Sequence, residues 1–219
     1  MKVYISDTRK NPQYDGEKNK LKSLRNAMFS HVLSEDFGCD ETAALKNKYG
    51  KPYIPGSDID FSITHSTDVC AIAVSDKPVG IDIEKKDRVK NIDGMLRFFS
   101  DEEKTRIEKA DDKAAEFLRI WTYREAFSKE EGVGLTLYTK ENIVIDYEKN
   151  RVLRNGRTLN FFEVYYDDYL LTICSEDEIQ PMNNAAKHIP MANIIKSSNP
   201  GLSIAVLNTS PFGTSAETW

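Results

Sequence analysis

Hydrophobic residues recur along the chain with two different periods, and these periods predict its helices and strands. The apolar positions between residues 20 and 33 follow helical spacing, so we expect an amphipathic helix there. Phe61–His65 and Val79–Glu84 alternate between apolar and polar residues, which is typical of half-buried strands. Val69–Val74 is a continuous apolar run and predicts a fully buried strand.

The second half of the chain predicts two helices followed by a strand meander. Ser100 with Glu103 three residues later matches a capping box at a helix start. A long helix is expected over residues 112–130, ended by the glycines that follow it. Lys51–Pro55, broken by prolines, predicts an extended loop. The meander is expected in four runs: Asn142–Ile145, Val152–Leu153, Phe161–Tyr166 and Tyr169–Cys174.

A faint internal repeat suggests that the fold is duplicated. Phe61–Ser75 aligns without gaps with Phe161–Ser175 at an offset of 100, sharing Phe, Asp and Ser at matched positions. Chance is the alternative, because few residues are identical. The repeat favours an α+β pseudo-dimer of two similar α+β halves, with domains at 1–77 and 78–180. Residues 181–219 differ in composition and form a tail of unknown role, in which Leu202–Leu207 could pair with a sheet edge.

Composition narrows the class of protein. The net charge of −5 argues against general nucleic-acid binding. No apolar run is long enough to cross a membrane and the N-terminus lacks the pattern of a signal peptide, so we expect a cytoplasmic protein. The three scattered cysteines predict neither a zinc site nor a disulfide framework.

Two carboxylates within the strand at residues 79–84 are the first candidate for chemistry. Asp82 and Glu84 share one face of the strand, with backbones about 6.6 Å apart, and can reach one hard cation. The alternative is a solvated acidic face. Gly80 favours a site, because it lets another group approach the backbone closely.

The long helix adds a third carboxylate and a cation. Trp121, Glu125 and Lys129 are spaced by four and share one helical face. Glu125 and Lys129 could be a surface ion pair, or they could supply a metal ligand and a phosphate contact. The chemistry of the donors suits Mg²⁺.

Four further residues are ambiguous. Glu103 is either the capping residue or a general base for a hydroxyl nucleophile. Thr64 and His65 lie near a strand end, where a phosphate contact competes with an ordinary polar role. Lys51 is a solvated loop cation or a phosphate ligand.

Taken in order, these stretches resemble the 4′-phosphopantetheinyl transferases of the Sfp type. The resemblance covers roughly residues 1–180. The motifs that carry it are Gly50-Lys51-Pro52, Phe61 to Ser66, Gly80-Ile81-Asp82-Ile83-Glu84, Phe98 to Glu103 and Trp121 to Lys129.

The resemblance implies a reaction and a set of roles. The family moves the phosphopantetheine arm of coenzyme A onto a serine of an apo acyl, peptidyl or aryl carrier protein, in fatty-acid, polyketide or non-ribosomal peptide biosynthesis. It implies a monomer, a coenzyme A co-substrate and Mg²⁺, with Mn²⁺ as a substitute. The implied metal ligands are Asp82, Glu84 and Glu125. The implied coenzyme A contacts are Lys51, Thr64, His65, Asp82 and Lys129, and the implied catalytic residues are Glu103 and Lys129.

Two other functions remain open at this point. One is a non-catalytic module of the same fold that binds carrier proteins or coenzyme A, and the other is a metal-dependent phosphoesterase. The sequence also departs from many relatives at Arg124, where they have lysine, and this puts a phosphate contact there in doubt. Lys18, Lys20, Lys22 and Arg25 lie where relatives bind the 3′-phosphate, without a residue-by-residue alignment.

Overall fold

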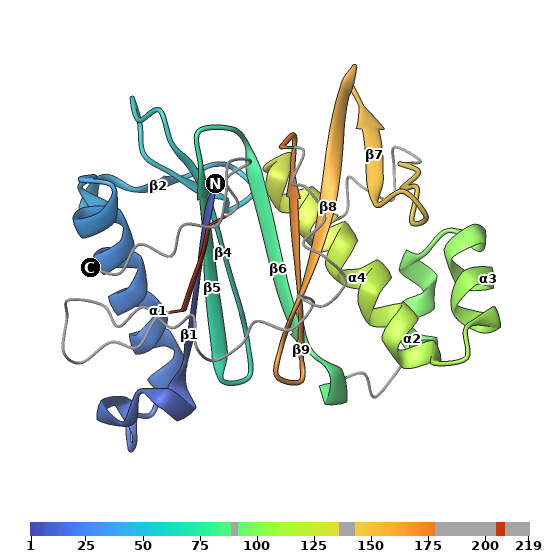
Figure 1. Cartoon of the computed structure of the whole chain (residues 1–219), viewed down its shortest axis with the longest axis horizontal. Helices are drawn as coiled ribbons and strands as arrows, with labels where there is room; N and C mark the ends of the chain where they lie inside the picture. The colour runs from blue at the N-terminus through green and yellow to red at the C-terminus, as the bar shows by residue number, and fades with distance from the viewer. Residues whose placement is uncertain (89–91, 136–142, 178–204, 209–219) are drawn as a thin grey trace.

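The fold is built on two four-stranded antiparallel sheets, each covered on its outer face by a helix (Figure 1). The computed structural model describes residues 1–88, 92–135, 143–177 and 205–208. The helices are α1 (Lys20–His31), α2 (Ile92–Met95), α3 (Asp101–Lys109) and α4 (Lys113–Glu130). The strands are β1 (Lys2–Asp7), β2 (Leu45–Lys46), β3 (Pro52–Tyr53), β4 (Asp60–Ser66), β5 (Val69–Ser75), β6 (Val79–Lys85), β7 (Arg151–Arg154), β8 (Arg157–Tyr166), β9 (Tyr169–Ser175) and β10 (Ala205–Asn208).

The two sheets repeat one topology. The first has the strand order β10-β1-β5-β4 and the second has the order β6-β9-β8-β7, so β1-β5-β4 corresponds to β6-β9-β8. Phe61 pairs with Val74 across β4 and β5, and Phe161 pairs with Cys174 across β8 and β9. The residues of the second pair are numbered 100 higher than those of the first, so the repeat seen in the sequence has the same strand register in both sheets. Each half also inserts its long helix after its first strand, α1 in one half and α4 in the other.

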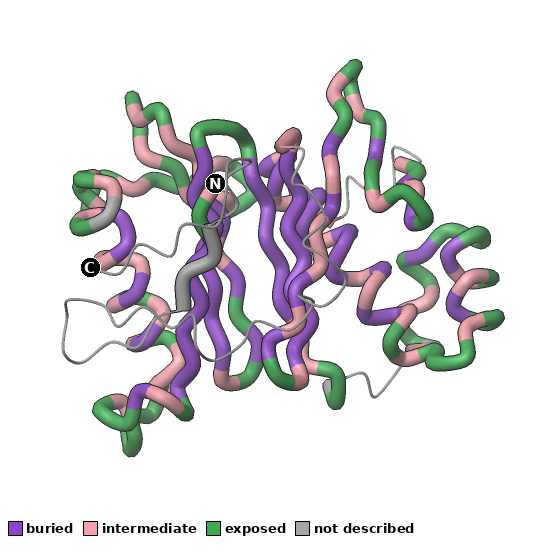
Figure 2. Tube along the Cα trace, viewed as in Figure 1, coloured by how far each residue is buried: buried purple, intermediate pink, exposed green. Residues whose placement is uncertain are grey.

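Three clusters of buried side chains hold these layers together, and buried residues gather along the central strands (Figure 2). One cluster lies between α1 and the first sheet, and a second lies between α4 and the second sheet. The third joins the two sheets, with Val3, Ile5 and Ala71 from one and Ile81, Ile83 and others from the second. Because both faces of β5 and β9 are covered, every residue of these two strands is buried.

The predicted elements are confirmed in most places. The helix expected over residues 20–33 ends as an α-helix at His31 and continues as a π-helical turn, Val32–Asp36. The capping box at Ser100 and the helix expected over residues 112–130 are both present. Within the stretch expected to be a loop, Pro52 and Tyr53 form the short strand β3 against β2.

The strand expected at Asn142–Ile145 is wrong over the three residues that the structure describes. Residues 143–145 have no regular structure, although Ile145 is buried in the α4 cluster and Val144 is 69% exposed. Side chains that anchor a loop alternate in the same way as side chains on a strand, and no strand in the described part of the chain pairs with residues 143–145. Asn142 lies outside the described residues.

The tail contributes one strand to the first sheet. β10 pairs antiparallel with β1, with Tyr4 opposite Val206, so the expectation of edge pairing is confirmed for residues 205–207, and Asn208 extends the strand by one residue. The other predictions for the tail, including pairing of Leu202–Ile204, fall outside the described residues. The division at residues 77 and 78 falls between β5 and β6 and stays a prediction. Within the described residues, no helix is long and apolar enough to cross a membrane.

Candidate active site

Asp82 and Glu84 lie on β6 at the point where β6 meets both β4 and α4. Ile81 and Ile83 alternate with them and are fully buried in the cluster between the sheets. Asp82 is also buried, at 5% exposure, whereas Glu84 is half-buried. The alternation predicted from the sequence therefore sends both carboxylates to one side of the strand.

Gly80 brings α4 directly onto this strand. A Cβ atom at position 80 would lie 1.9 Å from the carbonyl oxygen of Ala126 and 2.5 Å from the backbone nitrogen of Glu130. Neither atom can move without moving the helix. The close backbone approach expected at Gly80 is confirmed, and it sets how near the side chains of α4 come to those of β6.

Helix α4 carries Glu125 and Lys129 to the carboxylates of β6. Asp112 begins the helix, and its side chain accepts a hydrogen bond from the backbone of Ala115. The Lys129 ammonium lies 2.7 Å from Oδ1 of Asp82 and 3.3 Å from the hydroxyl of Thr64. The same hydroxyl donates to Oδ1 of Asp82 at 3.0 Å. Lys129 is thus paired across the junction rather than with Glu125 on its own helix.

The three carboxylates affect one another electrostatically. Burial raises the pKa of Glu125 to about 7 from its ordinary value of 4.5. The negative charge of Asp82 is the next largest cause, Glu84 adds to it, and Lys129 opposes the rise in this pKa. Like charges gathered in a partly desolvated place are costly, and a bound cation would remove that cost.

The donors at this place fit a hard divalent cation. Oδ2 of Asp82 is buried without a hydrogen-bond partner, although its sister oxygen has two. Within the described residues, no three acidic, histidine or cysteine side chains converge into a ready-made metal cage. An open site with few carboxylates is the kind that Mg²⁺ uses when substrate phosphates and water complete its shell.

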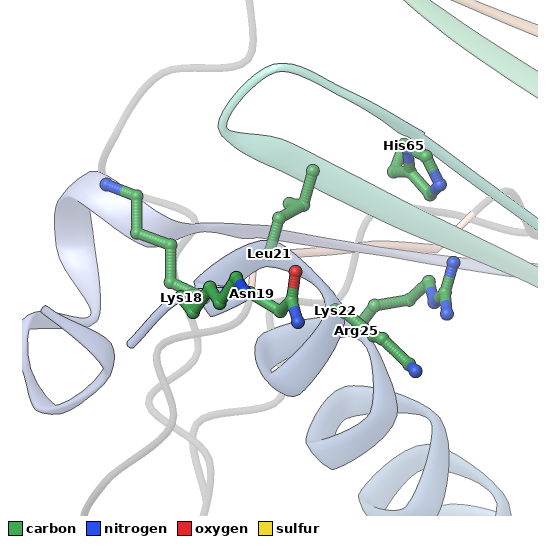
Figure 3. Close-up of a pocket in the computed structure, with 7 residues that line it drawn as sticks. Lys18, Asn19, Leu21, Lys22, Arg25 and His65 are labelled. Atoms are coloured by element: carbon green, nitrogen blue, oxygen red, sulfur yellow. The ribbon is translucent and has the colours of Figure 1, made fainter. Parts of the chain in front are cut away.

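His65 points away from these carboxylates and belongs to a second place. Because neighbours on a strand face opposite sides, Thr64 and Ser66 turn toward β6 while His65 turns toward the N-terminal end of α1. There it lines a pocket of about 340 Å³, with Arg25 extending from α1 on the same side (Figure 3). The remaining lining residues are Lys18, Asn19, Lys20, Leu21 and Lys22.

This pocket suits an anion. Four of its lining side chains are permanent cations, and the pocket includes no acidic residue. The positive end of the α1 dipole adds to their field. The four cations that the sequence placed near the expected 3′-phosphate site are therefore gathered around His65.

Glu103 is occupied by structural contacts. Its Oε2 accepts a hydrogen bond from the backbone of Ser100 at 2.8 Å, which completes the capping box. Its Oε1 accepts from the Tyr147 hydroxyl at 2.6 Å and lies 3.3 Å from Nε of Arg124. With 5% of the residue exposed, Glu103 has the surroundings of a buried cap. The role of Glu103 as a general base stays a prediction.

Arg124 explains the departure noted in the sequence. It is buried, donates to the backbone oxygen of Phe98 and lies over the ring of Phe99 at 4.9 Å. These contacts, with the ion pair to Glu103, join α4 to the start of α3. A planar guanidinium can lie over a ring and direct separate N–H groups at two acceptors, a geometry that a lysine ammonium does not have.

Lys51 lies at the junction of the two halves. Its ammonium is 2.6 Å from Asp60, 3.2 Å from the carbonyl oxygen of Val79 and 3.3 Å from that of Glu130. It therefore contacts the start of β4, the start of β6 and the end of α4. Lys51 is not among the residues that line the pocket around His65.

Sequence reasoning missed the part that Ser66 plays. Its hydroxyl donates to Oε2 of Glu84 at 2.7 Å. The signal was available, because Ser66 lies two residues after Thr64 on the same strand face. What could not be read was that this face meets β6.

Comparison with known proteins identifies a family for most of this region. The family model described as the 4′-phosphopantetheinyl transferase superfamily matches residues 78–174. A 4′-phosphopantetheinyl transferase of Bacillus subtilis is 36% identical over 136 residues, which are 58% of this chain and 60% of that protein. The 4′-phosphopantetheinyl transferase Sfp of Bacillus subtilis (strain 168) is 33% identical over 52% of this chain and 53% of its own length.

A longer match comes from a third relative. The 4′-phosphopantetheinyl transferase ffp of Bacillus subtilis is 32% identical over 162 residues, which cover 69% of this chain and 72% of that protein. The chain spans little more than half the length of the first two relatives. The residues that the family model matches, 78–174, include β6 and α4, which carry the carboxylates.

Proposed function

The chain belongs to the 4′-phosphopantetheinyl transferase superfamily, and on this premise we propose that it transfers the phosphopantetheine arm of coenzyme A to a serine of an apo carrier protein. The observation that carries the proposal is the group of Asp82, Glu84 and Glu125 with Lys129 among them. A pocket lined with cations lies on the other side of β4. This pairing suits a substrate that has a pyrophosphate and a further phosphate.

We propose Asp82, Glu84 and Glu125 as the metal ligands. The buried, unpartnered Oδ2 of Asp82 and the raised pKa of Glu125 support this assignment. Mg²⁺ is the proposed ion, and Mn²⁺ has the same preference for oxygen ligands. These three carboxylates would hold the divalent cation, and when bound it would supply positive charge to offset the negative charge of the pyrophosphate.

The chain's own residues hold and balance the reacting groups. The serine hydroxyl of the carrier gives its proton to a base, predicted to be Glu103, and its oxygen forms a bond to the phosphorus that carries pantetheine. The bond from that phosphorus to the bridging oxygen breaks. Adenosine 3′,5′-bisphosphate leaves with the electron pair. The Lys129 ammonium, held at the junction by Asp82 and Thr64, is placed to stabilise or protonate the departing phosphate.

The basic pocket is the proposed place for the 3′-phosphate side of coenzyme A. His65, Lys22 and Arg25 come from two elements, so a phosphate there would be held between β4 and α1. Thr64 would fix Lys129 and Asp82, and Lys51 would support the junction near the nucleotide. Glu103 remains the predicted base, with its capping role as the competing interpretation.

We also propose the setting in which the chain works. One chain already supplies both halves of the site, so we propose a monomer. The proposed location is the cytoplasm, where its proposed substrates are found. Apo acyl, peptidyl or aryl carrier proteins are the proposed partners.

The proposal is tested by weighing a carrier protein. The chain is mixed with an apo carrier, coenzyme A and Mg²⁺, and the carrier is expected to gain the mass of one phosphopantetheine. Asp82→Asn should abolish the gain while circular dichroism stays unchanged, because the substitution keeps the shape and removes the charge. A panel of carriers without any mass gain would contradict the proposal.

The same experiment separates the competing functions. A binding module would retain coenzyme A without changing the carrier's mass. A phosphoesterase would release adenosine 3′,5′-bisphosphate when no carrier is present. We expect release only when a carrier is added, in equal amount to the modified carrier.

A further inference from the structure

The two sheets meet along β4 and β6 through side chains that follow one face of β4. Every second residue of β4 presents a polar group to β6, with the period of a strand face. The four contacts run in order along both strands: Val79 N to Asp60 Oδ2 at 2.8 Å, Ile81 N to Ser62 Oγ at 3.2 Å, Thr64 Oγ1 to Asp82 Oδ1 at 3.0 Å, and Ser66 Oγ to Glu84 Oε2 at 2.7 Å.

These contacts are of two kinds. Asp60 and Ser62 accept hydrogen bonds from the backbone of β6, so they hold the two strands together whatever side chains β6 carries. Thr64 and Ser66 instead donate to carboxylates of β6. The change from the first kind to the second occurs where the proposed metal ligands begin.

Ser66 has the features of a group that fixes a ligand. It is fully buried, and it lies on β4, whose pairing with β5 fixes the strand. Glu84 is half-buried and has three rotatable side-chain bonds. A short hydrogen bond to one of its oxygens restricts these rotations.

We propose that Ser66 is a positioning residue that holds Glu84 in place for the cation, so that the metal site on the second half is completed by a hydroxyl from the first. This inference rests on the proposed metal-dependent function. Ser66 touches neither substrate nor metal in this role. It acts through Glu84, as outer hydrogen-bond partners do in metal sites generally.

This arrangement gives strand β4 two tasks on its two faces. His65 faces the basic pocket, and its neighbours Thr64 and Ser66 face the carboxylates. One rigid strand thus fixes the separation between the pocket and the proposed metal site. Coenzyme A that spans both places would meet them at a preset distance.

Binding of Mn²⁺ measures the proposed role directly, without relying on activity. Free Mn²⁺ is followed by electron paramagnetic resonance at pH 8, with and without coenzyme A. We expect Ser66→Ala to weaken Mn²⁺ binding by about tenfold or more, the range found for outer-shell partners. Ser66→Cys, with a weaker donor, should fall between wild type and Ser66→Ala.

Ser62→Ala is the matched control. Ser62 is a serine on the same face of the same strand, 2% exposed, and bonded to backbone rather than to a carboxylate. We expect it to lower the thermal midpoint without metal and to leave Mn²⁺ affinity within about twofold of wild type. Thermal melts of all variants without metal check that each is folded.

The outcomes separate this inference from the proposed function. Equal Mn²⁺ affinity for wild type and Ser66→Ala would overturn the role of Ser66 alone, as would an equal loss in Ser62→Ala. A wild-type chain that binds no Mn²⁺ under either condition would overturn both the metal assignment and this inference. If Ser66→Ala does not fold, the loss of affinity in Ser66→Cys decides the matter.

Discussion

At the scale of single residues, burial and partners decide between roles that the sequence leaves open. Glu103 has both oxygens engaged, whereas Asp82 keeps one buried oxygen without a hydrogen bond. A carboxylate with an oxygen that lacks a hydrogen bond can bind a cation. A carboxylate whose two oxygens both accept hydrogen bonds can hold a helix in place. Asp82 and Glu103 therefore differ in their capacity to bind a cation, although the sequence places each of them within a predicted strand or helix.

Glu103→Gln distinguishes a cap from a base. Glutamine keeps the capping-box geometry but loses the charge that faces Arg124. We expect the free energy of unfolding to fall by about 1–2 kcal/mol and kcat/KM to fall by less than about tenfold. Urea unfolding and the carrier mass assay measure the two effects. A loss of about 10²-fold or more in kcat/KM with unchanged stability would instead identify Glu103 as a general base.

Glu125 gives the stability of the chain a pH dependence when no metal is bound. Its folded-state pKa, about 7, lies above its ordinary value of 4.5, so the folded chain keeps a proton that the unfolded chain has released. The contribution is therefore present below pH 4.5 and is lost as the pH rises through 7. We expect the loss to be about 1–3 kcal/mol.

Urea unfolding with EDTA at pH 5 and pH 8 checks this expectation. Glu125→Gln should show a smaller fall between the two pH values than the wild type. Burial also raises the pKa of Glu130 to about 7, so part of the fall should remain in the variant. Identical pH dependence in both proteins would contradict the account.

At the scale of elements, the contact between α4 and β6 controls the site. Gly80 allows the helix backbone to touch the strand, and this contact places Lys129 within hydrogen-bond distance of Asp82. The sequence motif that includes Gly80, Asp82 and Glu84 thus combines a packing requirement with a chemical one. A substitution that alters the packing of α4 on β6 should therefore also alter metal binding.

Gly80→Ala is expected to separate the helix from the strand. The added methyl would lie 1.9 Å from a backbone oxygen, which requires α4 to move. We expect a loss of about 2–3 kcal/mol in stability and a weaker affinity for Mn²⁺, measured by urea unfolding and by paramagnetic resonance. Gly94→Ala, at an exposed position in α2, is the control and should change neither quantity strongly.

At the scale of the whole molecule, the junction between the halves is held by contacts that bridge distant segments. Lys51 links the start of β4, the start of β6 and the end of α4, and Asn47 adds a hydrogen bond to the carbonyl oxygen of Gly132 at 2.8 Å. These contacts lie at one end of the same strands that carry Thr64 and Asp82. The junction and the site are therefore parts of one structure.

Lys51→Met should weaken the junction and leave the basic pocket intact. Asp60 and two carbonyl oxygens would lose a charged donor, so we expect stability to fall by about 2 kcal/mol. Calorimetric affinity for coenzyme A should stay within about threefold, whereas Lys22→Met, in the pocket, should weaken it more and make it less sensitive to salt. A large loss of coenzyme A affinity in Lys51→Met with unchanged stability would favour the phosphate role expected from the sequence.

The sequence by itself determined the strands β4 to β9, the long helices and the family motifs, because these depend on local periodicity and on residues a few positions apart. It also carried the repeat, since Phe61–Ser75 and Phe161–Ser175 keep the same offset and the same register. It did not predict β1. It failed at residues 143–145, where alternation marks an anchored loop.

Only the tertiary structure decided which side chains meet. Ser66 and Glu84 are 18 positions apart, and Lys129 is 47 positions from Asp82, so no local pattern records their contacts. The meeting of β4 with β6, and of β6 with α4, follows from burial of apolar faces over the whole chain. Packing of β4 against β6 therefore turns Thr64 and Ser66 toward the carboxylates and turns His65 toward the basic pocket.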